Sequence, residues 1–374
     1  MPLVIGVAAE TTPGERRLSV VPDVVKKYLA LGAEVVMQKG AGLPAHFRDE
    51  AFESVTWVDE DVDVCAAADI LLGVQPPSLK RIGKLKPGAV VLGFLQPWFD
   101  AKRAERLMER NITSFALELL PRISRSQSMD GLSSQAAVAG YECALIAADH
   151  SPKFFPMLTY AAGTIRPAKV LVIGAGVAGL QAIATARRIG AMVEAYDVRP
   201  ETREQIESLG AKFVDTGVSA AGLGGYAREL TDEEKAKQAE KLAKAVSQCD
   251  ALITTAAIPG KKAPVIITAA MVAGMKPGAV AHDTAAESGG NVEGTVAGEK
   301  TWVNDVLIVG PTPHHQPHSR CMPPRCTPEF NFISPLPSRT GADDGLGRRS
   351  DGRLLSHPTK GNRGLRGVKQ ILGL

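Results

Sequence analysis

A glycine-rich stretch between two apolar runs constrains the fold of this chain more than any other feature. Residues 168–200 read AKVLVIGAGVAGLQAIATARRIGAMVEAYDVRP, with Gly174, Gly176 and Gly179 directly after the first apolar run. A helix-like segment follows, and the second apolar run ends at Asp197, roughly 20 residues beyond the first glycine. A strand, GxGxxG, a helix and an acidic residue ending the next strand together predict a dinucleotide-binding unit.

Each glycine of the motif has its own expected role. Gly174 permits the tight turn, Gly176 lets backbone N–H groups approach a pyrophosphate, and Gly179 lets the helix pack closely on the strand. The positive end of the helix dipole favours the phosphates. Asp197 can accept hydrogen bonds from a ribose diol and would repel a 2′-phosphate, which favours NAD over NADP, while Arg199 weakens that preference. The alternative is a glycine-rich turn in an α/β domain that binds no nucleotide.

Length and composition indicate a soluble protein of two domains. A chain of 374 residues can build two cores, and its 45% hydrophobic and 22% charged residues are ordinary for globular proteins. No apolar run reaches the roughly 18 residues of a membrane span, and the N-terminus lacks the basic region of a signal peptide. Cys65, Cys143 and Cys249 stand isolated in apolar surroundings, which indicates buried thiols in a reducing cytoplasm.

The formal charge of +3 is concentrated at one end of the chain. Residues 313–374 hold ten basic and four acidic residues, which leaves 33 basic and 36 acidic residues in the rest. Because the excess of positive charge belongs to the tail, it does not indicate a nucleic-acid surface.

Apolar runs alternate with helix-like segments along most of the chain. This order predicts an α/β fold of two Rossmann-like, doubly wound parallel-sheet domains with a cleft between them. We expect an N-terminal domain at 1–135, an NAD-binding domain at 136–312 and a tail at 313–374. The run at 279–284 (AVAHDT) should be the last strand, and His282 within it should be a hydrogen-bonded or edge histidine rather than a catalytic one.

Three loops carry the remaining polar features. In the first domain, Arg16 and Arg17 either bind a carboxylate or contact a neighbouring helix. Residues 119–141 bring several polar side chains to a loop after a strand, where they either hold a nicotinamide or form a polar interdomain connection. The glycine-rich segment 216–234, with Tyr226 as its aromatic residue, is typical of a lid.

The composition changes abruptly after residue 312. The tail contains His314, His315, His318, Cys321 and Cys326, but prolines interrupt them and no regular element supports them, so no metal site is expected. Another explanation is a shifted reading frame. Back-translation of 321–329 from the third base of the first codon permits His-Ala-Ser-x-Leu/Met-Tyr-Ala/Ser-Arg, a helix-like peptide. We therefore expect an aberrant tail that is disordered or poorly packed.

Residues 3–312 resemble the NAD(H)-binding component, domain I, of proton-translocating nicotinamide nucleotide transhydrogenase. The resemblance rests on six segments: PRISRSQSMDGLSSQ at 121–135, GAGVAGLQAIATARRIGA at 174–191, DVRP at 197–200, GGYAREL at 224–230, IPGKKAPVIIT at 258–268 and AAESGGN at 285–291. It implies that Arg122, Gln127, Asp130 and Ser133 position the nicotinamide without acid–base chemistry. It implies nucleotide contacts from Gly174, Gly176, Val177, Gly179, Asp197, Val198, Arg199, Gly225, Tyr226, Gln238 and Ala257.

The resemblance also implies an activity and partners. Hydride would pass directly between NAD(H) on this chain and NADP(H) on a partner subunit, and a separate membrane-spanning subunit would couple the transfer to proton movement. The chain would form a homodimer in the cytoplasm, peripherally associated with the inner membrane through its partners. Such a chemistry requires positioning and exclusion of water, and no metal.

Departures from the family pattern define the alternatives. Leu230 replaces a usual methionine, His282 lies in a strand that is usually apolar, and the usual helical C-terminal segment is absent as written. Alanine dehydrogenase, the second candidate, needs a lysine and a histidine for proton transfer, and the matching strands here lead to Gln75 and Gln96. A third candidate, an NAD-binding module without turnover, has no use for the loop at 121–135.

Overall fold

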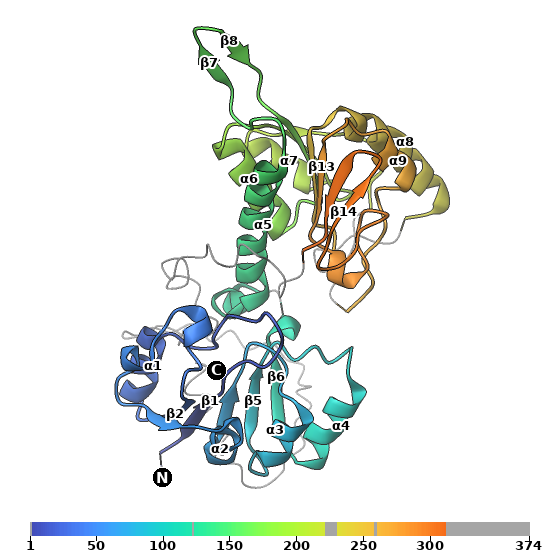
Figure 1. The fold of residues 1–374 in the computed structure, drawn as a ribbon. Coiled ribbons are helices and arrows are strands. Elements are labelled where there is room, and N and C mark those ends of the chain that lie inside the picture. The colour runs from blue at the N-terminus through green and yellow to red at the C-terminus, as the bar shows by residue number, and fades with distance from the viewer. Residues whose placement is uncertain (1, 122, 221–229, 258–259, 312–374) are drawn as a thin grey trace, which may run out of the picture. The chain divides into compact units, whose positions relative to one another are not determined.

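The computed structural model describes residues 2–121, 123–220, 230–257 and 260–311. The chain divides into two units, the first ending at Asp130 and the second beginning at Gly131, and each unit is built on its own sheet (Figure 1). The tail from residue 312 onward, with its expected frame change and disorder, lies outside the described residues.

The first unit contains a six-stranded parallel sheet in the order β3-β2-β1-β4-β5-β6. The strand order reverses between β1 and β4, as expected for a doubly wound fold. Its strands are β1 (Val4–Val7), β2 (Glu34–Gln38), β3 (Thr56–Val58), β4 (Ile70–Leu72), β5 (Val90–Gly93) and β6 (Thr113–Ala116). Its helices are α1 (Pro22–Ala30), α2 (Asp61–Ala67), α3 (Leu79–Lys84) and α4 (Ala101–Glu109), with 3-10 turns η1 (Leu43–Ala45), η2 (Asp49–Ala51), η3 (Leu117–Leu119) and η4 (Ser124–Met129).

Helices cover both faces of this sheet and bury it. Tyr28 of α1 belongs to the core on one face, and Cys65 of α2, Ile82 of α3 and Leu107 of α4 belong to the core on the other. The central strands read ILL and VVLG, and all their residues are buried, as a parallel sheet covered on both faces requires.

The second unit contains a seven-stranded sheet in the order β11-β10-β9-β12-β13-β15-β14, in which β14 alone runs antiparallel to its neighbour. Its main strands are β9 (Lys169–Ile173), β10 (Met192–Tyr196), β11 (Lys212–Phe213), β12 (Ala251–Thr254), β13 (Val280–Asp283), β14 (Lys300–Val303) and β15 (Val306–Val309). Its helices are α5 (Gly131–His150), α6 (Val177–Arg188), α7 (Thr202–Ser208), α8 (Asp232–Gln248) and α9 (Ala269–Ala273), with the 3-10 turn η6 (Ala286–Ser288). The predicted doubly wound α/β class is confirmed in both units.

The expectation that the strand at 279–284 would be the last is wrong. Two further strands, β14 and β15, follow β13 and pair antiparallel. The two residues between them, Asn304 and Asp305, have φ of 47° and 64°. Asparagine and aspartate tolerate this left-handed conformation, which two-residue hairpin turns require.

Close packing of α5 on α6 depends on one glycine. Both helices cover the same face of the second sheet, where Cys143 and Ile183 belong to one core; α8 and α9 cover the opposite face. A Cβ on Gly140 would lie 2.1 Å from the carbonyl oxygen of Ala178. Any side chain at this position would therefore force the two helices apart.

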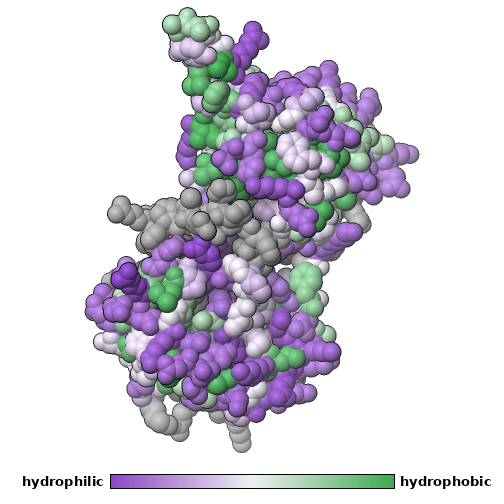
Figure 2. Space-filling model, in the orientation of Figure 1, coloured by the Kyte–Doolittle hydropathy of each residue, from purple (hydrophilic) through white to green (hydrophobic). Residues whose placement is uncertain are grey.

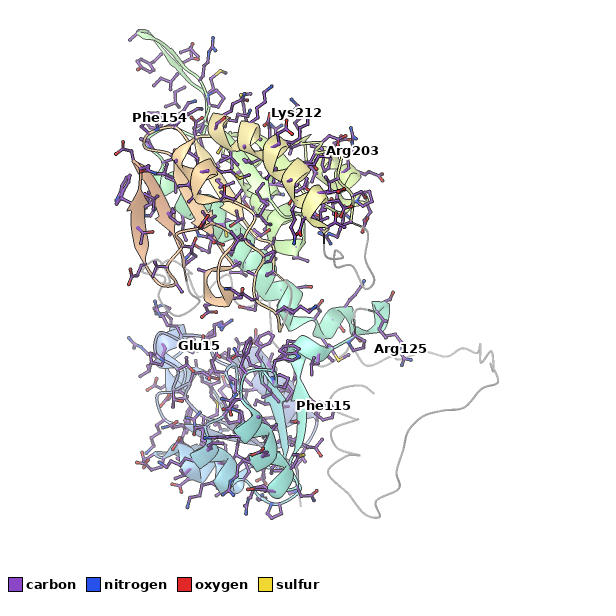
Figure 3. All side chains as sticks on the ribbon, turned by 90° about the vertical axis from the view of Figure 1, so that its right-hand side faces the viewer. Glu15, Phe115, Arg125, Phe154, Arg203 and Lys212 are labelled. Carbon is purple, nitrogen blue, oxygen red and sulfur yellow. The ribbon has the colours of Figure 1, made fainter. Side chains whose placement is uncertain are left out.

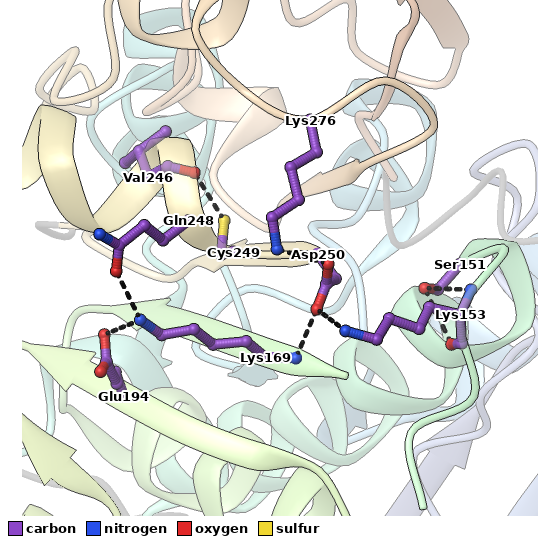
Figure 4. Close-up of polar contacts among 9 residues, drawn as sticks. All are labelled: Ser151, Lys153, Lys169, Glu194, Val246, Gln248, Cys249, Asp250 and Lys276. Carbon is purple, nitrogen blue, oxygen red and sulfur yellow. Dashed lines mark hydrogen bonds and ion pairs between the residues drawn. The ribbon is translucent and has the colours of Figure 1, made fainter. Parts of the chain in front are cut away.

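A two-stranded hairpin, β7 (Leu158–Tyr160) and β8 (Gly163–Ile165), projects from the second unit (Figure 1). Its approach segment and first strand expose apolar side chains, Phe154, Met157 and Tyr160 among them, and Figure 2 shows hydrophobic surface along this projection. Its base is fixed by Asp250, which accepts hydrogen bonds from the Lys153 ammonium at 2.9 Å and the Lys169 backbone N–H at 2.8 Å (Figure 4).

Asp250 also accepts a hydrogen bond from Lys276 Nζ at 2.7 Å. Burial alone would raise the pKa of its carboxyl, but the hydrogen bonds from Lys169, Lys276 and Lys153 lower the pKa below its usual value. The carboxylate is therefore charged at neutral pH and joins the start of β9 to the base of the hairpin. Across the described part of the chain, no helix is both long and apolar enough to cross a membrane.

Candidate nucleotide-binding site

The glycine loop after β9 has the backbone geometry that a dinucleotide-binding turn needs. Gly174 has φ of +94°, and a Cβ there would meet Thr255 Oγ1 at 2.8 Å. A Cβ on Gly179 would lie 1.8 Å from the Gly174 carbonyl oxygen, so only glycine lets α6 pack against the loop. A Cβ on Gly176, in contrast, would meet no atom within 4 Å. The space beside Gly176 thus fits a ligand that approaches the backbone.

The start of α6 offers backbone donors to an anion. Gly176 is the N-cap residue, and its helix has neither a side-chain cap nor an acidic residue in the first turn. Val177, the first helical residue, is 41% exposed. Uncapped N–H groups and the helix dipole together favour a phosphate at this point.

Asp197, directly after β10, is 8% exposed and already holds several donors. Its Oδ2 accepts a hydrogen bond from the Ala175 N–H at 2.7 Å, which ties the glycine loop to the end of β10. Arg199 donates from Nε to Oδ1 at 2.9 Å and from Nη2 to Oδ2 at 2.7 Å. The carboxylate expected to receive a ribose diol therefore also neutralises the adjacent arginine.

Thr255, directly after β12, contacts this loop and was missed by sequence reasoning. Its Oγ1 lies 3.1 Å from the Gly174 carbonyl oxygen and 3.3 Å from that of Ile173, so it fixes the start of the glycine loop from the neighbouring strand. The sequence signal for it is only a hydroxyl at the end of an apolar run.

The remaining described residues of this unit that were predicted to contact the nucleotide lie on α8, after β10 and after β12. Gln238, on α8, donates a hydrogen bond from Nε2 to the Tyr196 hydroxyl at 2.9 Å. Burial raises the pKa of that hydroxyl, so it stays protonated. Val198 packs on the core, and Ala257 follows β12. Gly225 and Tyr226, in the expected lid, lie outside the described residues.

The loop expected at the nicotinamide spans the division between the units. Gln127 is exposed and belongs to η4, and its carbonyl oxygen accepts a hydrogen bond from the Asp130 N–H at 3.3 Å. Ser133 lies in the first turn of α5, in the second unit. Arg122 lies outside the described residues. The roles of these four residues stay predictions.

In the first unit, Glu15 lies in the loop between β1 and α1 (Figure 3). Its carboxylate accepts hydrogen bonds from two side chains. Arg17 donates to both of its carboxylate oxygens, Nε to Oε1 at 2.8 Å and Nη2 to Oε2 at 2.6 Å, and Gln75 Nε2 donates to Oε2 at 2.7 Å. Burial would raise the pKa of Glu15, but the bonds from Arg17 and Gln75 lower it to about 2. Arg17 thus pairs with a carboxylate of its own loop, and Arg16 Nε donates to the Pro44 carbonyl oxygen, in η1, at 3.3 Å.

Gln96, the second position at which an alanine dehydrogenase would transfer a proton, lies just beyond β5. Its φ is +47°, and its backbone N–H donates to Glu118. Neither amide, Gln75 nor Gln96, can exchange a proton at neutral pH. In the described ranges, no group of three or more histidine, cysteine, aspartate or glutamate side chains is arranged to hold a metal ion. The histidines and cysteines of the tail lie outside those ranges.

Two family profiles match consecutive parts of the chain. The profile described as "Alanine dehydrogenase/PNT, N-terminal domain" matches residues 6–139, and "Alanine dehydrogenase/PNT, C-terminal domain" matches residues 143–318. The chain belongs to the alanine dehydrogenase/PNT family. The resemblance predicted from the sequence motifs is thereby confirmed.

Within the alanine dehydrogenase/PNT family, the chain belongs with the transhydrogenases. It is 45% identical over 319 residues to the first part of NAD(P) transhydrogenase subunit alpha of Rhodospirillum rubrum, covering 82% of this chain and 83% of that protein. It is 30% identical over 300 residues to the alanine dehydrogenase of Mycobacterium tuberculosis, covering 78% and 74%. The crystal structure of transhydrogenase from Sinorhizobium meliloti matches with a TM-score of 0.77 and 39% identity, covering 88% of this chain and 91% of that one.

His282, one of the departures from the family pattern, is buried in β13, between β12 and β15. The expectation of a hydrogen-bonded or edge histidine is wrong. Neither ring nitrogen has a hydrogen-bond partner among the described residues, and the strand is central. Burial lowers the pKa of the imidazole to about 4, so it is neutral at pH 7. This histidine is on a strand of the core, not at the glycine loop.

Proposed function

We propose that this chain is the NAD(H)-binding subunit of a proton-translocating transhydrogenase. The proposal rests on one contrast between the two units. The second keeps a complete dinucleotide loop with open space beside Gly176, whereas the first has amides where an alanine dehydrogenase needs groups that exchange protons. A chain that binds the nucleotide without acid–base groups suits direct hydride transfer between two nicotinamides.

Nucleotide binding would use the surfaces around the glycine loop. The N–H groups at the start of α6 would hold the pyrophosphate, and Asp197 with Arg199 would lie near the adenosine ribose. Gln127, Asp130 and Ser133 would orient the nicotinamide ring. When bound, NADH supplies the hydride; the chain's own contribution is to orient the ring and exclude water.

The expected partners follow from the same proposal. NADP(H) would bind on a partner subunit, and a membrane-spanning subunit would carry the protons, so this chain would lie at the cytoplasmic face of the inner membrane. A homodimer is supported by the projecting β7–β8 hairpin and the segment before it, whose exposed Tyr160 and Met157 favour contact with a second copy.

Single-turnover hydride transfer from NADH to a complementary NADP(H)-binding subunit tests the proposal. Gln127→Asn and Asp130→Asn should slow transfer by on the order of a hundredfold, because misplacing reacting atoms by about 1 Å has that effect. A lost hydrogen bond should weaken NADH affinity by only about 0.5–1.5 kcal/mol.

The matched control is Gln205→Asn, an equivalent change at an exposed position on α7. It should alter neither rate nor affinity. If both loop variants transfer hydride at the wild-type rate, the loop is only a connector between domains. If the wild-type chain fails to bind NADH, the proposed function itself is wrong.

A further inference from the structure

Asn291 is completely buried, and its side-chain amide bonds two points of the segment that follows β12. Its Oδ1 accepts a hydrogen bond from the Ala256 N–H at 3.0 Å. Its Nδ2 donates to the carbonyl oxygens of Ala256 and Pro264, both at 2.8 Å. Both amide hydrogens and the acceptor oxygen are thus engaged, and this partner set fixes the orientation of the amide.

The backbone of Asn291 is itself fixed by a buried carboxylate. Asp283, at the end of β13, accepts hydrogen bonds on Oδ2 from the N–H groups of Asn291 at 2.8 Å and Val292 at 3.0 Å. The hydroxyls of Thr254 and Thr295 donate to the same carboxylate, at 3.0 and 2.8 Å. A carboxylate with this many donors holds the turn before Asn291 in one conformation.

Ala256 lies against the glycine loop, so its position affects the ligand site. A Cβ on Gly174 would lie only 3.2 Å from the Ala256 nitrogen, and the neighbouring Thr255 hydroxyl bonds the Gly174 carbonyl. A continuous series of contacts therefore runs from Asp283 through Asn291 and Ala256 to Gly174. The series ends at the carboxyl edge of the sheet, where open α/β sheets bind ligands.

We infer that Asn291 is a positioning residue for the nucleotide: it holds the backbone after β12 at the distance from the glycine loop that a bound NADH requires. This inference rests on the proposed function, because it assumes that the second unit binds NADH. The bonds to Ala256 are the ones that bear on the ligand site, because the Ala256 nitrogen, which donates to Asn291, is the atom that lies beside Gly174.

Asn291→Asp is the informative variant because it preserves size and shape. An aspartate can still accept from the Ala256 N–H, but it directs an oxygen toward the carbonyls of Ala256 and Pro264, where the amide donated. Repulsion should displace the loop from the glycine turn. We expect the dissociation constant for NADH, measured by calorimetry, to rise by about tenfold or more, or about 1.4 kcal/mol per tenfold.

Thr295→Val provides the matched control. It removes a donor to the same Asp283 carboxylate without touching Ala256 or Pro264. The control should lower the melting temperature but leave NADH affinity within about twofold of wild type. Asn291→Ala serves as a second variant that removes the amide without adding repulsion. It decides the matter if the aspartate variant fails to fold, and it should weaken NADH binding in the same direction.

The outcomes separate the inference from the function on which it rests. If the wild type binds NADH and the folded Asn291 variants bind equally well, Asn291 is only part of the core and the inference is wrong. If Thr295→Val loses affinity as much as the Asn291 variants do, general destabilisation explains both, and the inference is also wrong. If the wild type itself does not bind NADH, the proposed function fails first.

Discussion

Arg199 donates to both carboxylate oxygens of Asp197, and the shorter of these contacts is 2.7 Å. We expect this ion pair to set the nucleotide preference of the second unit. An unpaired aspartate at this position would repel a 2′-phosphate, whereas an unpaired arginine would attract one. In the wild type the two side chains are paired, so their opposite effects on a 2′-phosphate partly cancel. The wild type should still prefer NADH over NADPH, because the carboxylate lies directly after β10, where a ribose diol is expected.

Asp197→Asn should reduce that preference by about tenfold or more. The amide keeps an oxygen for the Ala175 N–H but no longer neutralises Arg199, and a hydrogen bond to a charged group contributes about 1.5–3 kcal/mol. Calorimetric titration with each nucleotide measures the ratio. In the double variant Asp197→Asn with Arg199→Ala, the affinity for NADPH should not show the increase expected for Asp197→Asn alone. Equal affinities in the wild type, or an unchanged ratio in Asp197→Asn, would contradict this account.

Wild-type protein should show no alanine dehydrogenase activity. Gln75 and Gln96 cannot donate a proton to a carbonyl, and Arg17 is bound to Glu15. The pKa of Glu15, about 2, lies below its unfolded value of 4.5, so the carboxylate stays charged and paired at every assay pH. Pyruvate, ammonia and NADH should give no oxidation above background, with the Mycobacterium tuberculosis alanine dehydrogenase as positive control. Measurable alanine-dependent NAD reduction would favour the second candidate function.

What could be predicted from the sequence was what depends on local geometry. Gly174 and Gly179 have the roles expected of them because a turn and a close helix contact impose them within a few residues. The Asn304-Asp305 turn is equally local, because asparagine and aspartate tolerate its left-handed conformation, but the β14–β15 hairpin was not predicted. The expectation of a last strand at 279–284 failed because the apolar run at Val306–Val309 is short and gives little periodicity of its own.

Contacts between distant residues could not be predicted in this way. Glu15 and Arg17 are neighbours in sequence, but Gln75 reaches the same carboxylate only because β4 lies beside β1. Asn291 follows β13 and bonds Ala256, which follows β12, and no local sequence pattern indicates this contact. The engagement of Asp197 by Arg199 depends on side-chain conformations, which periodicity does not fix.

His282 should make the protein sensitive to moderate acid. The imidazole is buried without a hydrogen-bond partner in the part of the chain described here, and burial lowers its pKa from 6.5 to about 4. As the pH falls, the unfolded chain takes up a proton at this residue before the folded chain does. The free energy of unfolding therefore falls from about pH 6.5 to about pH 4, and this group lowers it no further below that pH. Across this range, the pKa shift corresponds to a loss of about 3 kcal/mol in the free energy of unfolding.

His282→Val should remove that dependence and stabilise the fold. Valine fits a buried strand and leaves no unsatisfied nitrogen, so the free energy of unfolding at pH 7 should rise by about 1–3 kcal/mol. Urea denaturation between pH 4.5 and 7.5 measures both effects. Val280→Ala, a change to a non-titrating residue on the same buried strand, should lower the free energy of unfolding by the same amount at every pH. If the stability of His282→Val depends on pH as steeply as that of the wild type, the burial of His282 does not determine the acid response.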